Sequence, residues 1–260
     1  MDDKKLENIN CDWCDSSNFQ IIFNDVIDNE LNTPGKFNVG RCIDCGLIYL
    51  SPRPKPEYIG ECYPDNYVPY QKEGKLISAV KKILWLKVIR NIKKLIKPGD
   101  SILEIGCSNG DFLHMLQDGN YKLYGLEINK NCIKTAKELY NLKIWHGRFE
   151  DFVFDPNIKF NFIIMNYVLE HLASPKAVFS KLKSITAPKA YQLISVPNYE
   201  SWERFIFKKY WHCLDVPRHF YIFSGKTMKR YADESGFEII ETKYSFMPND
   251  WIGSIGRFLK

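Results

Sequence analysis

Beyond residue 99, short apolar runs alternate with segments of helical periodicity. The apolar runs predict six strands, at 101–105, 122–127, 142–146, 161–167, 190–196 and 237–244. Among the intervening segments, Ser174 before Pro175, and Ser224 further along, are typical of helix N-termini. This alternation predicts an α/β fold with a doubly wound, mostly parallel sheet, which binds ligands at the carboxyl ends of its strands.

The chain ahead of residue 99 has a different composition and pattern. Residues 1–70 are rich in Cys, Pro, Asn and Tyr, with short extended runs, and predict a small module with many loops. Apolar positions from 75 to 96 recur with a period near 3.6, which predicts an amphipathic helix that ends at Pro98-Gly99. We therefore expect a module at 1–70, a helix and linker at 71–98, and a larger domain at 99–260.

Length and composition suit one sizeable core with a minor addition. The chain has 260 residues, of which 45% are hydrophobic. Its N-terminal decapeptide MDDKKLENIN lacks the apolar segment of a signal peptide, and no run approaches the roughly 18 to 20 apolar residues of a spanning helix. We expect a cytoplasmic protein.

The segment LEIGCSNGDF, residues 103–112, reads as a strand, a tight turn and the start of a helix. Gly106 and Gly110 permit the turn and let a ligand approach the backbone closely. A dinucleotide-binding fingerprint needs glycines in the spacing GxGxxG, but those positions hold Gly106, Ser108 and Asp111. The turn therefore predicts a nucleoside ligand of a different kind.

Carboxylates around this turn narrow the choice of ligand. Glu104 and Asp111 disfavour a pyrophosphate and favour a ligand with positive charge, such as a sulfonium that carries an amino acid. Glu127 ends the next predicted strand, where a carboxylate can accept hydrogen bonds from both ribose hydroxyls.

With these features the chain resembles the class I S-adenosylmethionine-dependent methyltransferases over residues 99–244. The match includes the first glycine motif with Ser108 for its middle glycine, the acid Glu127, the segment 146–151 after the third strand, and the motif at 160–171. Arg148 and Asn161 depart from the acids usual in the family. The resemblance implies a Rossmann-like sheet and S-adenosylmethionine as cofactor. It implies these cofactor contacts: Glu104, Gly106, Ser108, Gly110, Glu127, Ile128, Phe149, Glu150 and Asn166.

The same family normally adds a seventh, antiparallel strand beside the sixth. Residues 245–260, SFMPNDWIGSIGRFLK, show no clear strand pattern. We expect the seventh strand to be missing, with the sheet completed differently or by a partner, or the product shortened.

Glu170 and His171 follow the fourth predicted strand, where the resemblance places the cofactor and acceptor. A histidine of near-neutral pKa suits a general base, and Glu170 would orient it or contact the acceptor. Alternatively, His171 caps or packs the following turn. We expect His171 and Glu170 to be catalytic.

A second polar and aromatic segment, YWHCLDVPRHFYIF at 210–223, follows the fifth predicted strand. It resembles the acceptor-covering insertion of the family, which we place at 197–223. His219 is a further catalytic candidate, and Arg218 and Trp211 are candidate substrate contacts. The alternative is an aromatic-packed loop whose His and Arg bind backbone carbonyls.

Four of the eight cysteines form two CxxC pairs. Their spacing is typical of a zinc ribbon or knuckle, in which four thiolates hold a structural ion and leave no position for a catalytic water. Reduced thiols or a redox pair are the alternative. The proposed zinc ligands are Cys11, Cys14, Cys42 and Cys45.

The N-terminal module is similar to cysteine-rich modules of bacterial methyltransferases that act on nucleotide-linked sugars. There such modules help to form the acceptor pocket, which makes Tyr67 and Tyr70 candidate substrate contacts. The chain lacks the large C-terminal domain of the sugar C-methyltransferases, so the sugar and the choice of carbon or oxygen stay open.

Residues 72–97 hold nine Lys or Arg and a single acid, within a chain of net charge +5. The helix there is expected to cover the cofactor; contact with anionic lipid or with nucleic acid are the alternatives. Nucleic acid is not the expected partner, because the basic residues are not interleaved with aromatics. Peripheral membrane contact stays open.

Taken with the resemblance, these features predict a methyltransferase for a small hydroxylated acceptor, a sugar or glycan precursor. The alternatives are a quinone or lipid O-methyltransferase, and a zinc-ribbon protein that binds or modifies RNA.

Overall fold

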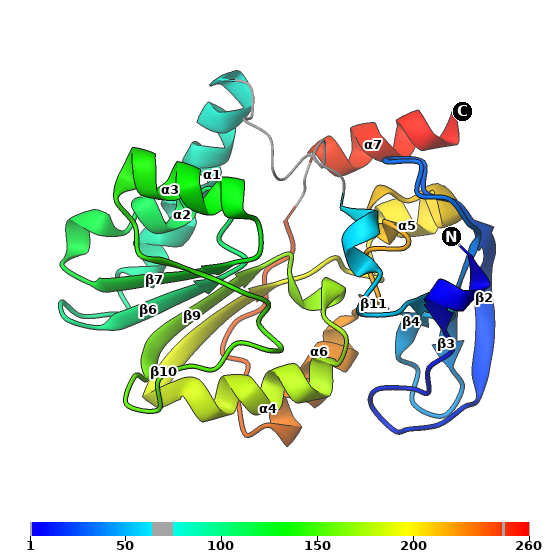
Figure 1. The fold of residues 1–260 in the computed structure, drawn as a ribbon, viewed down its shortest axis with the longest axis horizontal. Coiled ribbons are helices and arrows are strands. Elements are labelled where there is room, and N and C mark those ends of the chain that lie inside the picture. Colours follow the sequence, from blue (N-terminus) through cyan, green and yellow to red (C-terminus); the bar gives the residue numbers. More distant parts are fainter. Residues whose placement is uncertain (1, 64–74, 246–247, 260) are drawn as a thin grey trace. The chain divides into compact units, whose positions relative to one another are not determined.

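The computed structural model describes residues 2–63, 75–245 and 248–259 (Figure 1). The chain forms two compact units that interleave along the sequence. The cysteine-rich unit comprises Met1–Pro64, Leu169–Ser180 and Val196–Lys260, and the parallel-sheet unit comprises Asp65–Val168 and Lys181–Ser195. The limits predicted from the sequence (1–70, 71–98 and 99–260) differ from these units and stay a prediction.

The parallel-sheet unit contains five parallel strands in the order β10-β9-β6-β7-β8. This sheet confirms the predicted doubly wound fold. Strand β6 lies at its centre, and the chain first adds strands on one side of β6 and then on the other (Figure 1). The strands are β6 (Ser101–Ile105), β7 (Lys122–Glu127), β8 (Ile144–His146), β9 (Phe160–Asn166) and β10 (Thr186–Ser195).

Helices with one apolar face cover this sheet. Ile89 and Ile92 of the basic helix α1 lie in one buried cluster with Ile102 of β6 and Phe162 of β9, so the apolar stripe packs as its periodicity predicted. The helical segments of this region are α1 (Lys75–Ile92), α2 (Asp111–His114), η4 (Gln117–Gly119), α3 (Lys130–Tyr140) and α4 (Pro175–Ile185), the last of which crosses the unit boundary.

The cysteine-rich unit contains a four-stranded antiparallel sheet in the order β11-β4-β3-β2, and a short ladder of β1 with β5. The strand β11 lies in the predicted insertion and pairs with β4 near the N-terminus, so this part of the insertion is built into the module's sheet. The strands are β1 (Leu6–Glu7), β2 (Phe19–Val26), β3 (Phe37–Cys42), β4 (Ile48–Leu50), β5 (Arg53–Pro54) and β11 (Tyr221–Ile222).

Short helices complete this unit. Ser224 caps α6 in a reciprocal capping box with Thr227, which confirms the predicted helix start. Ser174 likewise accepts a hydrogen bond from the backbone of Ala177 in α4. The helices are η1 (Asp3–Lys5), η2 (Ile59–Cys62), η5 (Leu169–His171), α5 (Trp202–Phe207), η6 (Lys208–Tyr210), η7 (His212–Leu214), α6 (Gly225–Glu234) and α7 (Pro248–Phe258).

The predicted sixth strand at 237–244 is wrong. These residues form no regular element, and Ile240 and Tyr244 are exposed. Alternation of apolar residues gives a segment one apolar face, but a strand also needs a neighbour for its backbone hydrogen bonds. Within the described residues, β10 pairs only with β9 and the parallel sheet ends there.

Candidate functional site

The turn after β6 lies where the strand order of the parallel sheet reverses. Its backbone enters the left-handed region at Gly106 (φ 69°), Ser108 (φ 46°) and Gly110 (φ 76°). A Cβ atom on Gly106 would lie 2.5 Å from Cγ2 of Val168, so this position requires glycine on grounds of both conformation and space. The turn predicted from the sequence is therefore present at the switch point where doubly wound sheets bind their ligands.

Glu104 lies buried under this turn, and in the described part of the chain its Oε2 has no hydrogen-bond partner. Burial and the nearby Glu127 and Asp111 carboxylates raise the pKa of Glu104 to about 8. A hydrogen bond from Asn166 acts in the opposite direction and lowers it. Asn166 accepts from Ser195 through Oδ1 at 3.0 Å, so its amide nitrogen is the group that donates to Glu104. A buried carboxyl without a counter-ion suits a cationic ligand group.

Glu127 is held in place by three backbone amides at the end of β7. The amides of Ile128 and Asn129 donate to Oε1 at 2.8 Å each, and that of Ser108 donates to Oε2 at 2.9 Å. Oε1 already accepts two hydrogen bonds, whereas Oε2 accepts one and keeps a lone pair for a further donor. The carboxylate is thus preorganised to accept a hydroxyl group at Oε2, in line with the ribose contact predicted from the sequence.

Lys181 fixes the segment after β8, a role that the sequence pattern did not indicate. Lys181 of α4 donates to the carbonyl oxygens of Phe149 at 2.6 Å and Glu150 at 3.0 Å. Its ammonium group also lies 5.1 Å from the ring centroid of Phe149. Nothing in the local pattern of α4 distinguishes Lys181 from the other lysines of that helix, because its role depends on a segment about thirty positions earlier.

The four predicted zinc ligands converge in the cysteine-rich unit. One sulfur atom from each of Cys11, Cys14, Cys42 and Cys45 lies within 4.8 Å of all the others. The Cys11–Cys45 and Cys14–Cys42 sulfur separations are 3.3 and 3.6 Å, near the about 3.8 Å that a tetrahedral zinc with bonds of about 2.3 Å requires. The donor set fits a structural zinc ion.

The two CxxC turns share one backbone geometry. Asp15 (φ 58°) and Gly46 (φ 80°) each stand four residues after the first cysteine of their turn. Their amides donate to the carbonyls of Cys11 and Cys42, at 2.8 Å in both cases. Each turn thus directs a pair of sulfurs to one point, which explains why two separate sequence motifs form one cluster.

A second group of possible ligands, the Glu170 cluster, consists of Glu170, His171 and His219 in the cysteine-rich unit. One ligand atom from each residue lies within 4.8 Å of the other two. Glu170 is 0% exposed, and burial raises its pKa to about 8. Burial lowers the pKa of His171 to about 3 and also lowers that of His219, so both rings are neutral. The structure thus brings the three predicted catalytic residues together.

A sequence profile described as "Methyltransferase domain" matches residues 78–242. The chain belongs to this methyltransferase family. No curated protein matches the chain at the threshold used.

Solved methyltransferases share the fold of this one. A putative sarcosine dimethylglycine methyltransferase from Galdieria sulphuraria is similar with 14% identity and a TM-score of 0.56, over 74% of this chain and 73% of that one. A putative methyltransferase from Bacillus halodurans shows 16% identity and a TM-score of 0.52, over 66% and 77%. At these identities the likeness shows the fold alone.

S-adenosylmethionine, the methyl donor of the family, fits the parallel-sheet site of this methyltransferase. Glu104 offers a buried carboxyl oxygen, Oε2, that has no partner among the described residues, for a cationic group, and Glu127 offers Oε2 for a ribose hydroxyl. Phe149 and Glu150 follow β8, as the family's adenine-side segment does. The predicted cofactor contacts, from Glu104 to Asn166, all belong to this unit.

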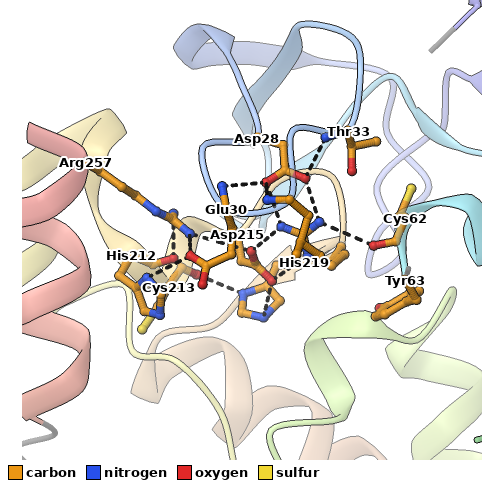
Figure 2. A network of polar contacts seen from close by, with 12 residues as sticks. Asp28, Glu30, Thr33, Cys62, Tyr63, His212, Cys213, Asp215, His219 and Arg257 are labelled. Carbon is orange, nitrogen blue, oxygen red and sulfur yellow. Dashed lines mark hydrogen bonds and ion pairs between the residues drawn. The ribbon is translucent and has the colours of Figure 1, made fainter. Parts of the chain in front are cut away.

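Arg218 does not have the substrate-binding role predicted for it. Its side chain is 0% exposed and all five of its N–H groups are used, because they donate to Asp28, Asp215 and the carbonyl of Cys62. Figure 2 labels these three partners. Its side chain therefore has no donor left for an acceptor molecule and serves to hold the unit together.

Trp211, the second substrate contact predicted in this insertion, is 1% exposed and packs inside the same unit. Its size and aromatic character suggested a loop over the acceptor, but burial makes it a core residue. Tyr67 and Tyr70 lie outside the described residues, so their predicted contacts stay predictions.

Proposed function

We propose that this methyltransferase transfers a methyl group from S-adenosylmethionine to a small hydroxylated acceptor, a sugar or glycan precursor. The observation that carries this proposal is the Glu170 cluster. Glu170 and His171 follow the end of β9 by four and five residues. The cluster offers the neutral imidazole of His219 as proton acceptor, because a pKa of about 3 makes His171 the weaker base.

In the proposed reaction an acceptor oxygen or carbon attacks the methyl carbon and the sulfur–carbon bond breaks. S-adenosylhomocysteine leaves with the electron pair of that bond, and the acceptor proton passes to an imidazole of the Glu170 cluster. Bound S-adenosylmethionine supplies an electrophilic methyl group. Glu104 holds its cationic amino acid part, and Glu127 holds its ribose. Orientation of the two reactants supplies most of the acceleration.

The N-terminal module supports a sugar-type acceptor. The N-terminal cysteine-rich module resembles those of bacterial methyltransferases that act on nucleotide-linked sugars. The four cysteines form a closed donor set that suits structural zinc, which would stabilise this module and take no part in methyl transfer.

The first experiment is calorimetric titration of S-adenosylmethionine and S-adenosylhomocysteine into the zinc-replete protein. We expect micromolar binding that weakens about tenfold or more in Glu127→Ala, because a hydrogen bond to a charged group contributes about 1.5 kcal/mol. Glu138→Ala, at an exposed site of α3, is the matched control and should bind like the natural chain. Equal affinity in both variants would contradict the assigned ribose site.

The acceptor class is tested by S-adenosylhomocysteine release with a panel of nucleotide-linked sugars. Turnover with one of them, lost in His219→Gln, would support the proposal. Turnover with quinones or lipids alone would contradict the sugar acceptor and favour the second candidate function.

A quinone or lipid acceptor is the second candidate, and the exposed apolar surface of α5 and α7 favours it. These helices contact each other. Trp202 of α5 is 78% exposed and Phe258 of α7 is 59% exposed, and clustered exposed apolar residues mark interaction or membrane surfaces. The described residues include no helix long and apolar enough to cross a bilayer, so such contact would be peripheral.

A further inference from the structure

We propose that the Glu170 cluster is a second metal site, which binds a divalent first-row transition ion such as Mn²⁺, Co²⁺ or Zn²⁺. The three side chains come from two segments: Glu170 and His171 from η5, and His219 from the turn before β11. Each presents a ligand atom within 4.8 Å of the other two.

A hydrogen bond fixes the tautomer of His219. Its Nδ1 lies 2.8 Å from the carbonyl oxygen of Cys213, which only accepts, so Nδ1 carries the proton and Nε2 presents a lone pair. Nδ1 of His171 lies 3.1 Å from the carbonyl oxygen of Arg218 and 3.0 Å from the hydroxyl of Tyr63, which can donate or accept. A backbone carbonyl that fixes one ring nitrogen so that the other can ligate is the usual arrangement around metal-bound histidine.

The Glu170 carboxyl has no cationic partner among the described residues. Both carboxylate oxygens of Glu170 are buried, and neither has a hydrogen-bond partner among residues 2–63, 75–245 and 248–259. Nε2 of His219 lies 4.0 Å from Oε1 of Glu170 and 3.8 Å from Oδ2 of Asp215. The nearby cation Arg218 is paired with Asp28 and Asp215. Lone pairs of Glu170 and of Nε2 of His219 thus converge beside a ring nitrogen of His171, and no described group donates to the buried carboxyl.

The donor set selects the kind of ion. Two imidazole nitrogens and one carboxylate suit first-row transition ions and leave coordination positions open, unlike the closed four-cysteine site. Bonds of about 2.1 Å bring ligand atoms to about 3–3.5 Å from one another, so the 4.0 Å separation of His219 and Glu170 would shorten on binding.

The open positions give the ion a role toward the acceptor. Two oxygens of a hydroxylated acceptor can fill neighbouring positions, and a bound hydroxyl loses its proton more readily. With the ion bound, the ligating nitrogens cannot accept a proton, so the acceptor proton passes to water instead of to an imidazole. This role rests on the proposed function, whereas binding of the ion does not.

Mn²⁺ is the probe that separates the two metal sites, because thiolate sites do not favour it. The zinc-loaded full chain is titrated with Mn²⁺, and free Mn²⁺ is measured by electron paramagnetic resonance. We expect about one bound Mn²⁺ per chain, with affinity at least about tenfold weaker in Glu170→Gln and in His219→Gln. His114→Gln, an exposed histidine of α2, is the matched control.

S-adenosylmethionine calorimetry on the same samples shows whether each variant is folded, and it reports failure of the cofactor site separately. A second measurement needs no variant: Co²⁺ added to the zinc-loaded chain should give weak visible bands without thiolate charge-transfer absorption. Absence of Mn²⁺ binding, equal binding in all variants, or a Co²⁺ spectrum with thiolate bands alone would overturn the proposal.

Discussion

Glu104 shows how one buried residue can couple cofactor binding to protons. Its burial and raised pKa of about 8 keep it protonated at neutral pH in the cofactor-free protein. A cationic ligand group beside it would favour the ionised form and expel the proton. Because the pKa is higher in the folded state than in the unfolded one, this residue also makes the free protein less stable as pH rises from about 4.5 to 8.

We therefore expect binding of S-adenosylmethionine at pH 7 to release a proton from Glu104. Calorimetry in buffers of different ionisation enthalpy measures this release, and Glu104→Gln should lower it. The affinity of the natural chain should rise with pH up to about 8 more steeply than that of the variant. The same proton release in both proteins would contradict the assignment.

Arg218 illustrates a residue whose character was evident from the sequence and whose role was not. It joins Asp28, 190 residues away, to Asp215, three residues away, and its own side chain is 0% exposed. These ion pairs hold the pKa of Asp28 well below its usual range, despite its burial. A charged residue in a loop suggests ligand binding until its partners are known.

Arg218→Met should destabilise the protein by about 3–5 kcal/mol, because it leaves two carboxylates buried without a counter-charge. The free energy of unfolding in urea measures the effect. Lys229→Met is the control, since the exposed Lys229–Asp233 pair of α6 should contribute at most about 1 kcal/mol. Similar losses in both variants would contradict a structural role.

At the scale of elements, the two CxxC turns were the most predictable feature of the chain. Each is a short local turn, and each fixes its own pair of sulfurs. The stability of a small module of this kind depends on its ion, because ion binding and folding are coupled.

Cys14→Ser should remove one equivalent of zinc and lower the melting temperature. Zinc bound after gel filtration is measured together with thermal unfolding. The matched control is Cys213→Ser, a cysteine outside the four-sulfur cluster, which should keep its zinc. Unchanged zinc content in Cys14→Ser would contradict the assigned ligand set.

A strand needs an apolar face and a neighbouring strand for its backbone hydrogen bonds. The sequence shows the first of these directly, but not the second. The apolar runs that form β6, β7 and β9 are largely buried and were recognised. The run at 237–244 also alternates, but it pairs with no strand among the described residues. Alternation cannot report on a strand partner, because such a partner lies elsewhere in the sequence.

At the scale of the whole molecule, the chain leaves the cysteine-rich unit after Pro64 and re-enters it twice. The insertion after β10 contains α5 and supplies β11 to the N-terminal sheet, and α7 belongs to the same unit.

The apolar surface of α5 and α7 predicts binding to vesicles that contain anionic lipid. Trp202→Ser combined with Phe258→Ser should weaken this binding about 100-fold, because each side chain loses about 1.5 kcal/mol or more of burial. Vesicle flotation measures it. Ile43→Ser, an exposed apolar residue elsewhere in the same unit, is the control. Absence of vesicle binding in the natural chain would remove the support for a lipid or quinone acceptor.

The sequence by itself determined the class of sheet, the cofactor turn with Glu104 and Glu127, and the four-sulfur cluster. These features depend on short segments whose periodicity and spacing set their geometry directly. Tertiary structure alone decided that Arg218 pairs with Asp28 and that Lys181 fixes the segment after β8. It also decided that 237–244 pairs with no strand among the described residues, and that His219 meets Glu170. The physical reason is that a buried polar group takes its role from the partners that folding brings to it, and residue spacing along the chain does not encode those partners.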